Sequence, residues 1–343
     1  MMSKPLKHSK RLMKVLSVVK LATEEQKAQK KATRAAYGAT LAQLASEGKK
    51  IVAVDADLTG STTTKAFAQS SPENEKRLFN VGIAEQNMID VAAGLALAGN
   101  IAYTGSFAVF GTGRAYDQIR NTVCYSRLNV KIAPTHAGIS VGPDGGSHQM
   151  LEDISLMRGL PNMTVLVPAD YAAACAALRL AAETAGPVYV RMGRASVPAV
   201  YAPDVELAVG RAYVLKEGSD VTIVACGVEI AEANKAAEML SQEGINAEVI
   251  DAFSVKPLDT QTIGASLQKT GCAVVAEEHS IYGGLSSAVC EYASQNHPVP
   301  IECVAMKDKF GKSGEFEELM AYFNLDAAAI VQAVKNVLAR KNN

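Results

Sequence analysis

The sequence lacks the common signatures of nucleotide binding. Its 343 residues contain no G-x-G-x-x-G and no G-x-x-x-x-G-K-[ST] motif, so neither a dinucleotide site nor a P-loop is indicated. No apolar run approaches the roughly 20 residues that a membrane-spanning helix needs. The formal net charge is only −1, which gives no electrostatic reason to bind nucleic acid or an anionic membrane. We therefore expect neither of these as a partner.

Cysteine is also sparse and forms no motif. The six cysteines are scattered, without a C-x-x-C pair or a histidine at metal-ligand spacing. Several lie in apolar runs such as TIVACG and IECVAM, where a thiol packs as a small hydrophobe. This usage predicts free thiols in a reducing, cytoplasmic compartment and no metal site on this chain.

Acidic residues are missing before Glu24, whereas six lysines and arginines lie in the same stretch. Transit peptides are rich in arginine and serine, and this stretch is rich in lysine instead. We therefore interpret residues 1–29 as a solvated basic arm that can touch a partner chain.

What the sequence does contain is a regular alternation of β-branched runs with alanine-rich helical stretches. Strands are expected at 50–57, 100–107, 129–138, 164–170 and 187–192, and helices at 33–47, 86–98, 113–127, 151–158 and 171–184. Continuously apolar strands separated by helices are typical of a mostly parallel sheet that is covered on both faces. Residues 30–195 are therefore predicted to form one doubly wound α/β domain.

The alternation stops over 193–220, where prolines occur and no helical period is sustained. We assign 196–205 as a linker and expect a small hairpin-like crossing in this region. The alternation then resumes with the strand-like runs VTIVACG, NAEVIDAF, GCAVVAEEH and PIECVAM, and with helices near 228–243, 259–269, 283–295 and 326–340. Residues 206–343 are therefore predicted to form a second doubly wound α/β domain.

The polar residues that could carry chemistry follow the predicted strands of the first domain. Ligands of parallel α/β sheets bind at the carboxyl ends of the strands. These ends carry the segments DADLTGSTTT, GSFAVFGTGRAYDQ, PTHAGISVGPDGGSHQMLED and RMGR. Together the segments indicate one shared site at this edge of the sheet.

Several of the candidates in these segments also have a plainer explanation. Phe107 and Phe110 fit core packing equally well, and His136 fits a hydrogen-bonded core histidine. Asp144, within GPDGG, is typical of an ordinary turn. His148 is harder to explain in this way, because its glycine-rich loop is too polar for a core.

The charged candidate residues also have two possible interpretations each. Glu85 follows the strand-like run LFNVGI and begins a helix, so it is either a first-turn cap or an acid that exchanges a proton with a bound molecule. Arg191 and Arg194 follow a buried strand, and such arginines suit a phosphate as well as the surface.

Four segments, in their order and spacing, resemble the pyrimidine-binding domain of the transketolases: FNVGIAEQNM, GSFAVFGTGRAYDQIR, PTHAGISVGPDGGSHQMLEDI and PVYVRMGR. The residues that follow, through VIDAFSVKPLD and AEEHSIYGGLSSAV, resemble the transketolase C-terminal domain. The likeness covers about residues 30–340. The family's other domain, which carries a G-D-G motif for the metal and the diphosphate, has no counterpart in this sequence. The chain therefore resembles the C-terminal section of a split, two-subunit transketolase.

The resemblance implies thiamine diphosphate as the cofactor, with Mg²⁺ or Ca²⁺ held by an N-terminal partner subunit. Glu85 matches the glutamate that faces N1′ of the aminopyrimidine ring, which favours the acid over the cap. Phe107 and Phe110 match aromatic residues that stack on this ring, and Asp57 matches an acid near the cofactor. Gly113 stands where full-length transketolases usually carry a further tyrosine, so the pyrimidine is held more loosely or by another residue.

The resemblance also implies a substrate and a reaction. His136 and His148 match histidines that contact the donor's oxygens, so they join Glu85 as expected catalytic residues, and Asp144 matches an acid that reads a substrate hydroxyl. The expected phosphate-binding residues are Arg194, Arg34 and Ser61, with Arg191 assisting. The implied reaction transfers a two-carbon ketol unit from a ketose phosphate to an aldose phosphate, and the implied assembly is α2β2.

Two alternatives remain. A 1-deoxyxylulose-5-phosphate synthase-like chain, or the β subunit of a 2-oxo acid dehydrogenase, would share the glutamate. The two histidines around GPDGG and the arginines favour sugar phosphates over 2-oxo acids. A non-catalytic scaffold subunit of the same fold is the other alternative, but the residues of the site are all present.

Overall fold

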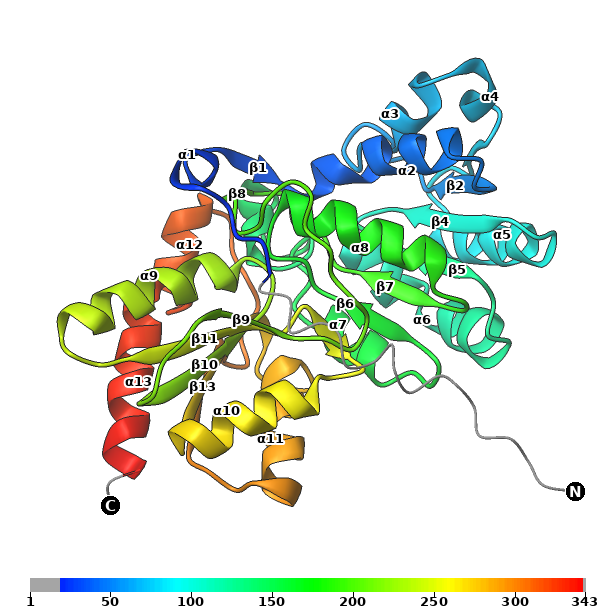
Figure 1. The fold of residues 1–343 in the computed structure, drawn as a ribbon. Helices are drawn as coiled ribbons and strands as arrows, with labels where there is room; N and C mark the ends of the chain where they lie inside the picture. The colour runs from blue at the N-terminus through cyan, green and yellow to red at the C-terminus, as the bar shows by residue number, and fades with distance from the viewer. Residues whose placement is uncertain (1–18, 342–343) are drawn as a thin grey trace, which may run out of the picture.

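Two mostly parallel sheets, each flanked by helices, organise residues 19–341, which are the residues that the computed structural model describes (Figure 1). The predicted α/β fold with two mostly parallel sheets is therefore confirmed. Most of the basic arm predicted over 1–29 lies outside the described residues. Its described end contains the short helix α1 (Glu24–Lys27) and an antiparallel bridge from Leu21 to Tyr201.

The first sheet has seven strands in the order β12-β6-β7-β5-β4-β2-β3. All neighbours are parallel except β12, which is antiparallel to β6. Strands β2, β5 and β7 are buried throughout, as continuously apolar runs of a parallel sheet should be. The bounds are β2 (Ile51–Asp55), β3 (Leu78–Asn80), β4 (Ile101–Gly105), β5 (Val130–Ile132), β6 (Thr164–Leu166), β7 (Val188–Val190) and β12 (Ser254–Lys256).

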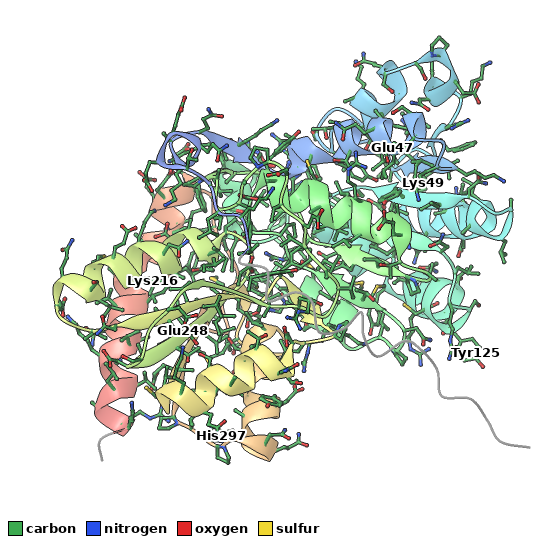
Figure 2. All side chains as sticks on the ribbon, in the orientation of Figure 1. Glu47, Lys49, Tyr125, Lys216, Glu248 and His297 are labelled. Atoms are coloured by element: carbon green, nitrogen blue, oxygen red, sulfur yellow. The ribbon has the colours of Figure 1, made fainter. Side chains whose placement is uncertain are left out.

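The second sheet has five strands in the order β14-β13-β10-β11-β9, with only β9 antiparallel to its neighbour. A charged residue also lies inside it: Glu248 on β11, labelled in Figure 2, is 2% exposed and pairs with Lys269. The bounds are β9 (Tyr213–Lys216), β10 (Val221–Ala225), β11 (Ala247–Asp251), β13 (Ala273–Ser280) and β14 (Ile301–Met306).

The helices lie on both faces of the sheets, and each predicted helix is found within a few residues of its expected position, with one exception. The helix expected over 113–127 is instead two π-helical stretches, η2 (Val109–Arg114) and η3 (Ile119–Tyr125), around the short α6 (Tyr116–Gln118). The helical segments at 64–69, 72–75 and 316–322 were not predicted. The other bounds are α2 (Ala36–Ser46), α3 (Thr64–Gln69), α4 (Pro72–Glu75), α5 (Glu85–Leu97), α7 (Asp153–Arg158), α8 (Tyr171–Glu183), α9 (Glu229–Gln242), α10 (Thr260–Thr270), α11 (Leu285–Asn296), α12 (Phe316–Tyr322) and α13 (Ala327–Lys341). Over residues 19–341, no helix combines the length and the apolarity needed to cross a membrane.

Two large apolar cores run through the described residues, each of them spanning both sheets, and a third small cluster contains Ala108, Ala137 and Met150. One core contains residues of α2, α8, α9 and α13, and the other contains residues of α5, α7, α10 and α11. These two groups of helices cover opposite faces, so that packing on either face joins the two halves of the chain (Figure 1).

The segment expected to be a linker is docked. Strand β8 (Ser196–Pro198) pairs with β1 (Lys30–Ala32), whereas β9 pairs with β11, so the predicted hairpin-like crossing is two separate pairings. Tyr201 is 1% exposed, and its hydroxyl donates to Asp251 at 2.6 Å. The backbone N–H groups of Val200 and Tyr201 donate to Asp170. These long-range contacts have no local sequence signal.

Candidate active site

The carboxyl ends of the parallel strands bring the predicted segments to one edge of the first sheet. Strands β2, β4, β5 and β7 lie next to one another in the sheet and are parallel. Along the chain they are not consecutive, because β3 comes between β2 and β4, and β6 comes between β5 and β7. The residues after these strands therefore start side by side. A parallel bridge between Phe107 and Thr135 continues the β4–β5 pairing into this region.

Four rings form an aromatic cluster at this edge, which we define as Phe107, Phe110, His136 and His148. Phe107 stacks on His136 with ring centroids 3.7 Å apart and lies parallel to Phe110 at 6.2 Å. The His148 ring meets Phe110 edge-on at 5.5 Å. Phe107 is buried and Phe110 is half-buried, so the cluster presents a partly open aromatic surface. Such a surface can stack on a planar ligand.

Glu85 lies beside this cluster and is not an N-cap. It is the first residue of α5, it is 2% exposed, and the N-cap position belongs to Ala84. Its carboxylate accepts a hydrogen bond from Arg114 Nη1 at 2.9 Å, and the Arg114 guanidinium carbon lies 4.8 Å from the centre of the Phe110 ring. Arg114 therefore links a buried acid to the aromatic cluster.

His136 is held as a neutral imidazole. Arg34 Nη1 lies 3.4 Å from its Nε2, and the Thr135 hydroxyl lies 2.7 Å from its Nδ1. Since a guanidinium can only donate, Nε2 accepts and Nδ1 carries the proton. Burial, with the nearby charges of Arg34 and Arg194, lowers the pKa of His136 to about 3. Its φ of 62° is left-handed, which is rare for a residue with a side chain and recurs at functional sites.

A pocket of about 400 Å³, which we call the cationic pocket, is lined by Lys30, Arg34 and Arg194 and also by the carboxylates of Glu315 and Glu317. Arg34 donates to the Ser61 carbonyl at 2.8 Å, and Arg194 donates to the Val141 carbonyl at 2.9 Å. Burial and the charge of Arg194 lower the pKa of Arg34. The remaining lining residues are Ser140, Gly142, Pro143, Ala195, Ser196 and Phe316. Glu317 pairs with Lys30 at 3.6 Å, which leaves the two guanidiniums of the lining as groups that suit an anion.

Asp57 and Asp144 are exposed. Asp57 follows β2 with a φ of 65°, and its backbone N–H donates to Asn80 at 3.2 Å. Asp144 ends the short 3-10 segment η4 (Ile139–Asp144), and its charge is felt by Arg34. The structure therefore places Asp144 near the cationic pocket and Asp57 near the end of β3.

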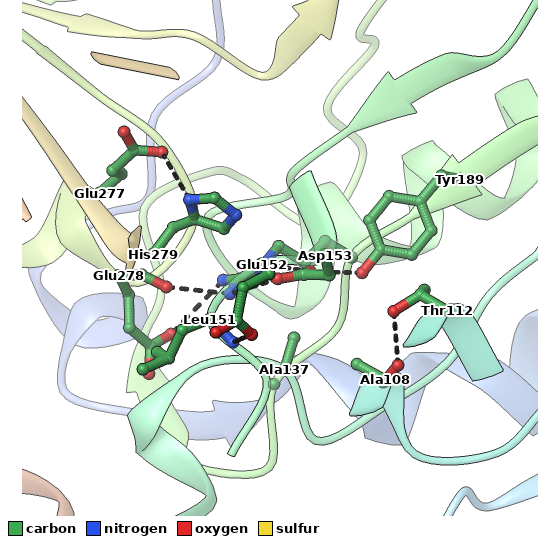
Figure 3. Close-up of polar contacts among 12 residues, drawn as sticks. Ala108, Thr112, Ala137, Leu151, Glu152, Asp153, Tyr189, Glu277, Glu278 and His279 are labelled. Carbon is green, nitrogen blue, oxygen red and sulfur yellow. Dashed lines mark hydrogen bonds and ion pairs between the residues drawn. The ribbon is translucent and has the colours of Figure 1, made fainter. Parts of the chain in front are cut away.

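Arg191 does not lie with the other candidates. It is 6% exposed, donates twice to Asp153 at 2.7 and 3.2 Å, and also contacts Glu278. Burial opposes the ionisation of Asp153, yet Arg191 keeps the pKa of this carboxyl below its usual value. Figure 3 shows Asp153 between Tyr189 and Glu278 in this interior network. Arg191 is thus fully engaged inside the protein, and its assignment to the substrate is not supported by this placement.

Sequence reasoning missed two residues that shape the site. Arg114 follows Phe110 by four positions, the spacing that places side chains on one helical face, and this was the available signal. Lys30 lies on β1 and reaches the pocket because β1 pairs with β8 next to Arg194. No local pattern marks such a pairing.

A buried acid beside stacked rings, next to a cation-lined pocket, defines a site for a planar, protonatable ring and an anionic partner molecule. Comparison with family models identifies the class. The transketolase pyrimidine-binding domain matches residues 29–199, and the transketolase C-terminal domain matches residues 210–330. The chain belongs to the transketolase family.

Individual proteins agree with this assignment. A transketolase C-terminal section from Methanocaldococcus jannaschii is 44% identical over 91% of this chain and 98% of its own length. A 6-deoxy-6-sulfo-D-fructose transketolase subunit from a Clostridium species is 42% identical over 90% and 95%. A structure titled a split gene transketolase, as an inactive β4 tetramer, is 50% identical with a TM-score of 0.82, and covers 90% of this chain and 99% of its own.

Transketolases use thiamine diphosphate, and the residues of this chain fit one end of that cofactor. An aminopyrimidine needs a flat apolar surface and an acid at a ring nitrogen. The aromatic cluster offers the surface, and Glu85 offers a buried carboxylate. Arg114 contacts both the Glu85 carboxylate and the Phe110 ring. Gly113, where a tyrosine was expected from the family, is exposed and leaves space near Met150.

Proposed function

We propose that this chain is the C-terminal subunit of a thiamine diphosphate-dependent transketolase that moves a two-carbon ketol unit from a ketose phosphate to an aldose phosphate. The observation that carries the proposal is the group of Glu85, Arg114 and Phe110. Phe107 and His136 connect this group to Arg34 of the pocket. This arrangement combines an acid for a protonatable ring with cations for a phosphate.

Thiamine diphosphate, when bound, supplies the carbanion chemistry. Glu85 would then hold and release a proton at the pyrimidine ring nitrogen, and its 2% exposure keeps water from competing for that proton. Phe107 and Phe110 would orient the ring by stacking. Asp57 is a further proposed contact of the cofactor region.

The substrate residues follow from charge and protonation. Nε2 of the neutral His136 can accept a hydrogen bond from a hydroxyl of the donor sugar in place of Arg34. The half-buried His148 can contact the donor's hydroxyl and carbonyl oxygens. Arg34 and Arg194 would bind the terminal phosphate, together with Ser61, whose backbone carbonyl accepts from Arg34. Asp144 would accept a hydrogen bond from a hydroxyl group near the phosphate end of the sugar.

The proposal includes an N-terminal partner subunit that binds the diphosphate and its Mg²⁺ or Ca²⁺, in an α2β2 assembly in the cytoplasm. Relatives support this part, because the archaeal protein is named as a C-terminal section and the split gene transketolase is titled an inactive β4 tetramer. The sugar itself is open. The sulfofructose relative acts on a sugar with a terminal sulfonate, which is also an anion that an arginine pair could bind.

The test is reconstitution. The purified chain, alone and with an N-terminal subunit that carries the G-D-G motif, is assayed with xylulose 5-phosphate and ribose 5-phosphate, and separately with pyruvate. We expect ketol transfer only by the pair, and no turnover of pyruvate. Transfer by the isolated chain would overturn the split-enzyme proposal. Pyruvate turnover by the pair would point instead to a deoxyxylulose phosphate synthase-like or 2-oxo acid enzyme.

A further inference from the structure

The second domain makes hydrogen bonds with the loop that carries Asp144 and His148, two of the proposed substrate-binding residues. We define the substrate loop as residues 138–149, which include Asp144 and His148. Gln149, at its end, is 5% exposed, and its Nε2 lies 3.2 Å from the Ile139 carbonyl, 3.4 Å from the Gly142 carbonyl and 2.9 Å from the Lys312 carbonyl. One buried amide therefore ties both ends of η4 to a segment of the second domain.

Glu278 holds the beginning of the same loop. It lies on β13 of the second sheet, is 2% exposed, and accepts a hydrogen bond from the backbone N–H of Ser140. Burial raises the pKa of Glu278, although the charge of Arg191 opposes the rise. Its neighbour Glu277 points elsewhere, since it accepts hydrogen bonds from the N–H groups at the start of α11.

At two glycines of the substrate loop, atoms of the second domain occupy the space that a side chain would need. A Cβ at Gly138 would overlap the Glu278 carboxyl group, and a Cβ at Gly145 would lie 2.5 Å from Ser313 Oγ. Both glycines also have φ near +78°, a left-handed value that favours glycine. The loop therefore has the shape of the surface on which it lies.

We propose that Gln149 and Glu278 are positioning residues through which the second domain sets the substrate loop, and with it recognition of the sugar by Asp144 and His148. The proposal rests on the proposed function for the identity of the substrate, but not for the mechanical link between domain and loop.

The geometry separates this role from cofactor activation. Arg114 binds the Glu85 carboxylate, and both residues lie outside the substrate loop. His148 of the substrate loop meets the edge of the Phe110 ring, so the loop reaches the rim of the aromatic cluster and not the hydrogen bond of the acid. Loosening the substrate loop should therefore weaken sugar binding and leave proton exchange at the cofactor unchanged. A general loss of folding would affect both.

The experiment compares Gln149→Met and Glu278→Met, which keep size but lose the hydrogen bonds, with Glu278→Gln, which keeps an acceptor for Ser140. The matched control is Glu277→Gln, on the same strand and equally buried. In the assembled enzyme we expect the methionine variants to raise KM for the donor sugar phosphate about tenfold or more, because displacing a positioning group by about 1 Å can cost up to 10²-fold. We expect Glu278→Gln to recover most of this loss and the control to leave KM unchanged.

Two further readouts decide the question. Exchange of the cofactor's C2 proton should keep its wild-type rate in the methionine variants. Hydrogen–deuterium exchange of the isolated chain, followed by mass spectrometry, should rise selectively in peptides that cover 138–149. Unchanged deuterium uptake, or a fall in C2 exchange parallel to the rise in KM, would overturn the proposal.

If Glu278→Met does not fold, Gly145→Ala replaces it, because the added methyl group pushes the substrate loop away from Ser313. We expect the same pattern of kinetics and deuterium uptake. If the wild-type pair shows no ketol transfer, the proposed function fails, whereas the deuterium-exchange comparison still tests the link between domain and loop.

Discussion

Glu85 depends on one charged neighbour for its orientation. Arg114 donates to it from a side chain that is 52% exposed, while the glutamate side chain is 3% exposed. Motif resemblance marked the glutamate but not the arginine, because the spacing that joins Phe110 to Arg114 is a weak signal by itself. The sequence therefore pointed to the acid as a candidate, and it did not point to the arginine that the structure places beside it.

Glu85→Gln tests the role of the acid. Glutamine keeps the size of the side chain and can still accept the hydrogen bond from Arg114, so we expect the variant to fold and assemble normally. We expect kcat to fall by roughly 10²-fold or more, the scale for losing a positioned proton-transfer group, together with slower exchange of the cofactor's C2 proton by NMR. The control is Asp90→Asn, an exposed carboxylate on the same helix. Wild-type C2 exchange in Glu85→Gln would contradict the assignment.

Arg191 and Arg194 show how local sequence can mislead. Both follow β7 in the segment RMGR, yet Arg191 turns into the interior toward Asp153, while Arg194 lines the cationic pocket. The difference depends on an acid that lies 38 positions earlier in the chain. Only the tertiary structure can separate two such arginines.

Arg194→Ala tests the pocket as an anion site. The change removes one charge-assisted contact, worth about 1.5–3 kcal/mol, so we expect KM for phosphorylated sugars to rise roughly 10- to 100-fold. For hydroxypyruvate, an unphosphorylated donor, we expect little change. The control is Arg179→Ala, an arginine on α8 that pairs with Glu47. Equal losses on both donors would mean that Arg194 supports the fold or the cofactor region instead.

At the scale of elements, periodic segments were predictable and pairings were not. Strand β2 was expected over 50–57 and α5 over 86–98, and both were found within a few residues. Strand β12 was not expected, because three residues carry no period and its partner β6 lies far away in the sequence. Likewise, the hydrogen-bonding register that turns 109–125 into π-helical stretches is not encoded in apolar spacing.

Strand β11 contains a buried carboxylate with a marked pH signature. Burial raises the pKa of Asp251 from 3.8 to about 8. Between these values the folded chain keeps a proton that the unfolded chain releases, so this group lowers stability as pH rises from about 4 to about 8.

Asp251→Asn should remove this cost, since the amide is neutral at every pH and still accepts from Tyr201. We expect Tm to rise at pH 8 by roughly 1–2 °C for each kcal/mol recovered in a chain of this size, and the gain over wild type to shrink toward pH 4. Scanning fluorimetry at both pH values measures it. The control is Asp259→Ala, which removes the cap of α10 and should lower Tm. A gain that does not depend on pH would contradict this explanation.

In the molecule as a whole, the regions that match the two family domains contribute to one common sheet and to common apolar cores. Strand β12 extends the first sheet from within the region that matches the C-terminal domain, and both apolar cores contain helices of each half. The boundary between 199 and 210 that separates the two family matches is therefore not a boundary between independent packing units.

We expect residues 19–341 to unfold as one cooperative unit. In calorimetry the full chain should give a single transition, because loss of either half exposes the apolar faces of the other. A chain truncated after residue 205 should lose β12, leave β6 as an open edge, and aggregate or melt well below the full chain. Two separate transitions of the full chain, or a truncated chain with an unchanged Tm, would contradict this expectation.

Strand β12 is synthesised after β6, its partner in the sheet, and this order affects the nascent chain. Strand β12 leaves the ribosome about 90 residues after β6, which corresponds to roughly 5–18 s at about 5–20 residues per second. During this interval the nascent sheet has β6 as a free edge that could pair with a neighbouring nascent chain. Pro161 and Pro168 bracket β6 and cannot donate to such a ladder. We therefore expect these two prolines to limit wrong pairing on the polysome until the chain supplies its own last strand.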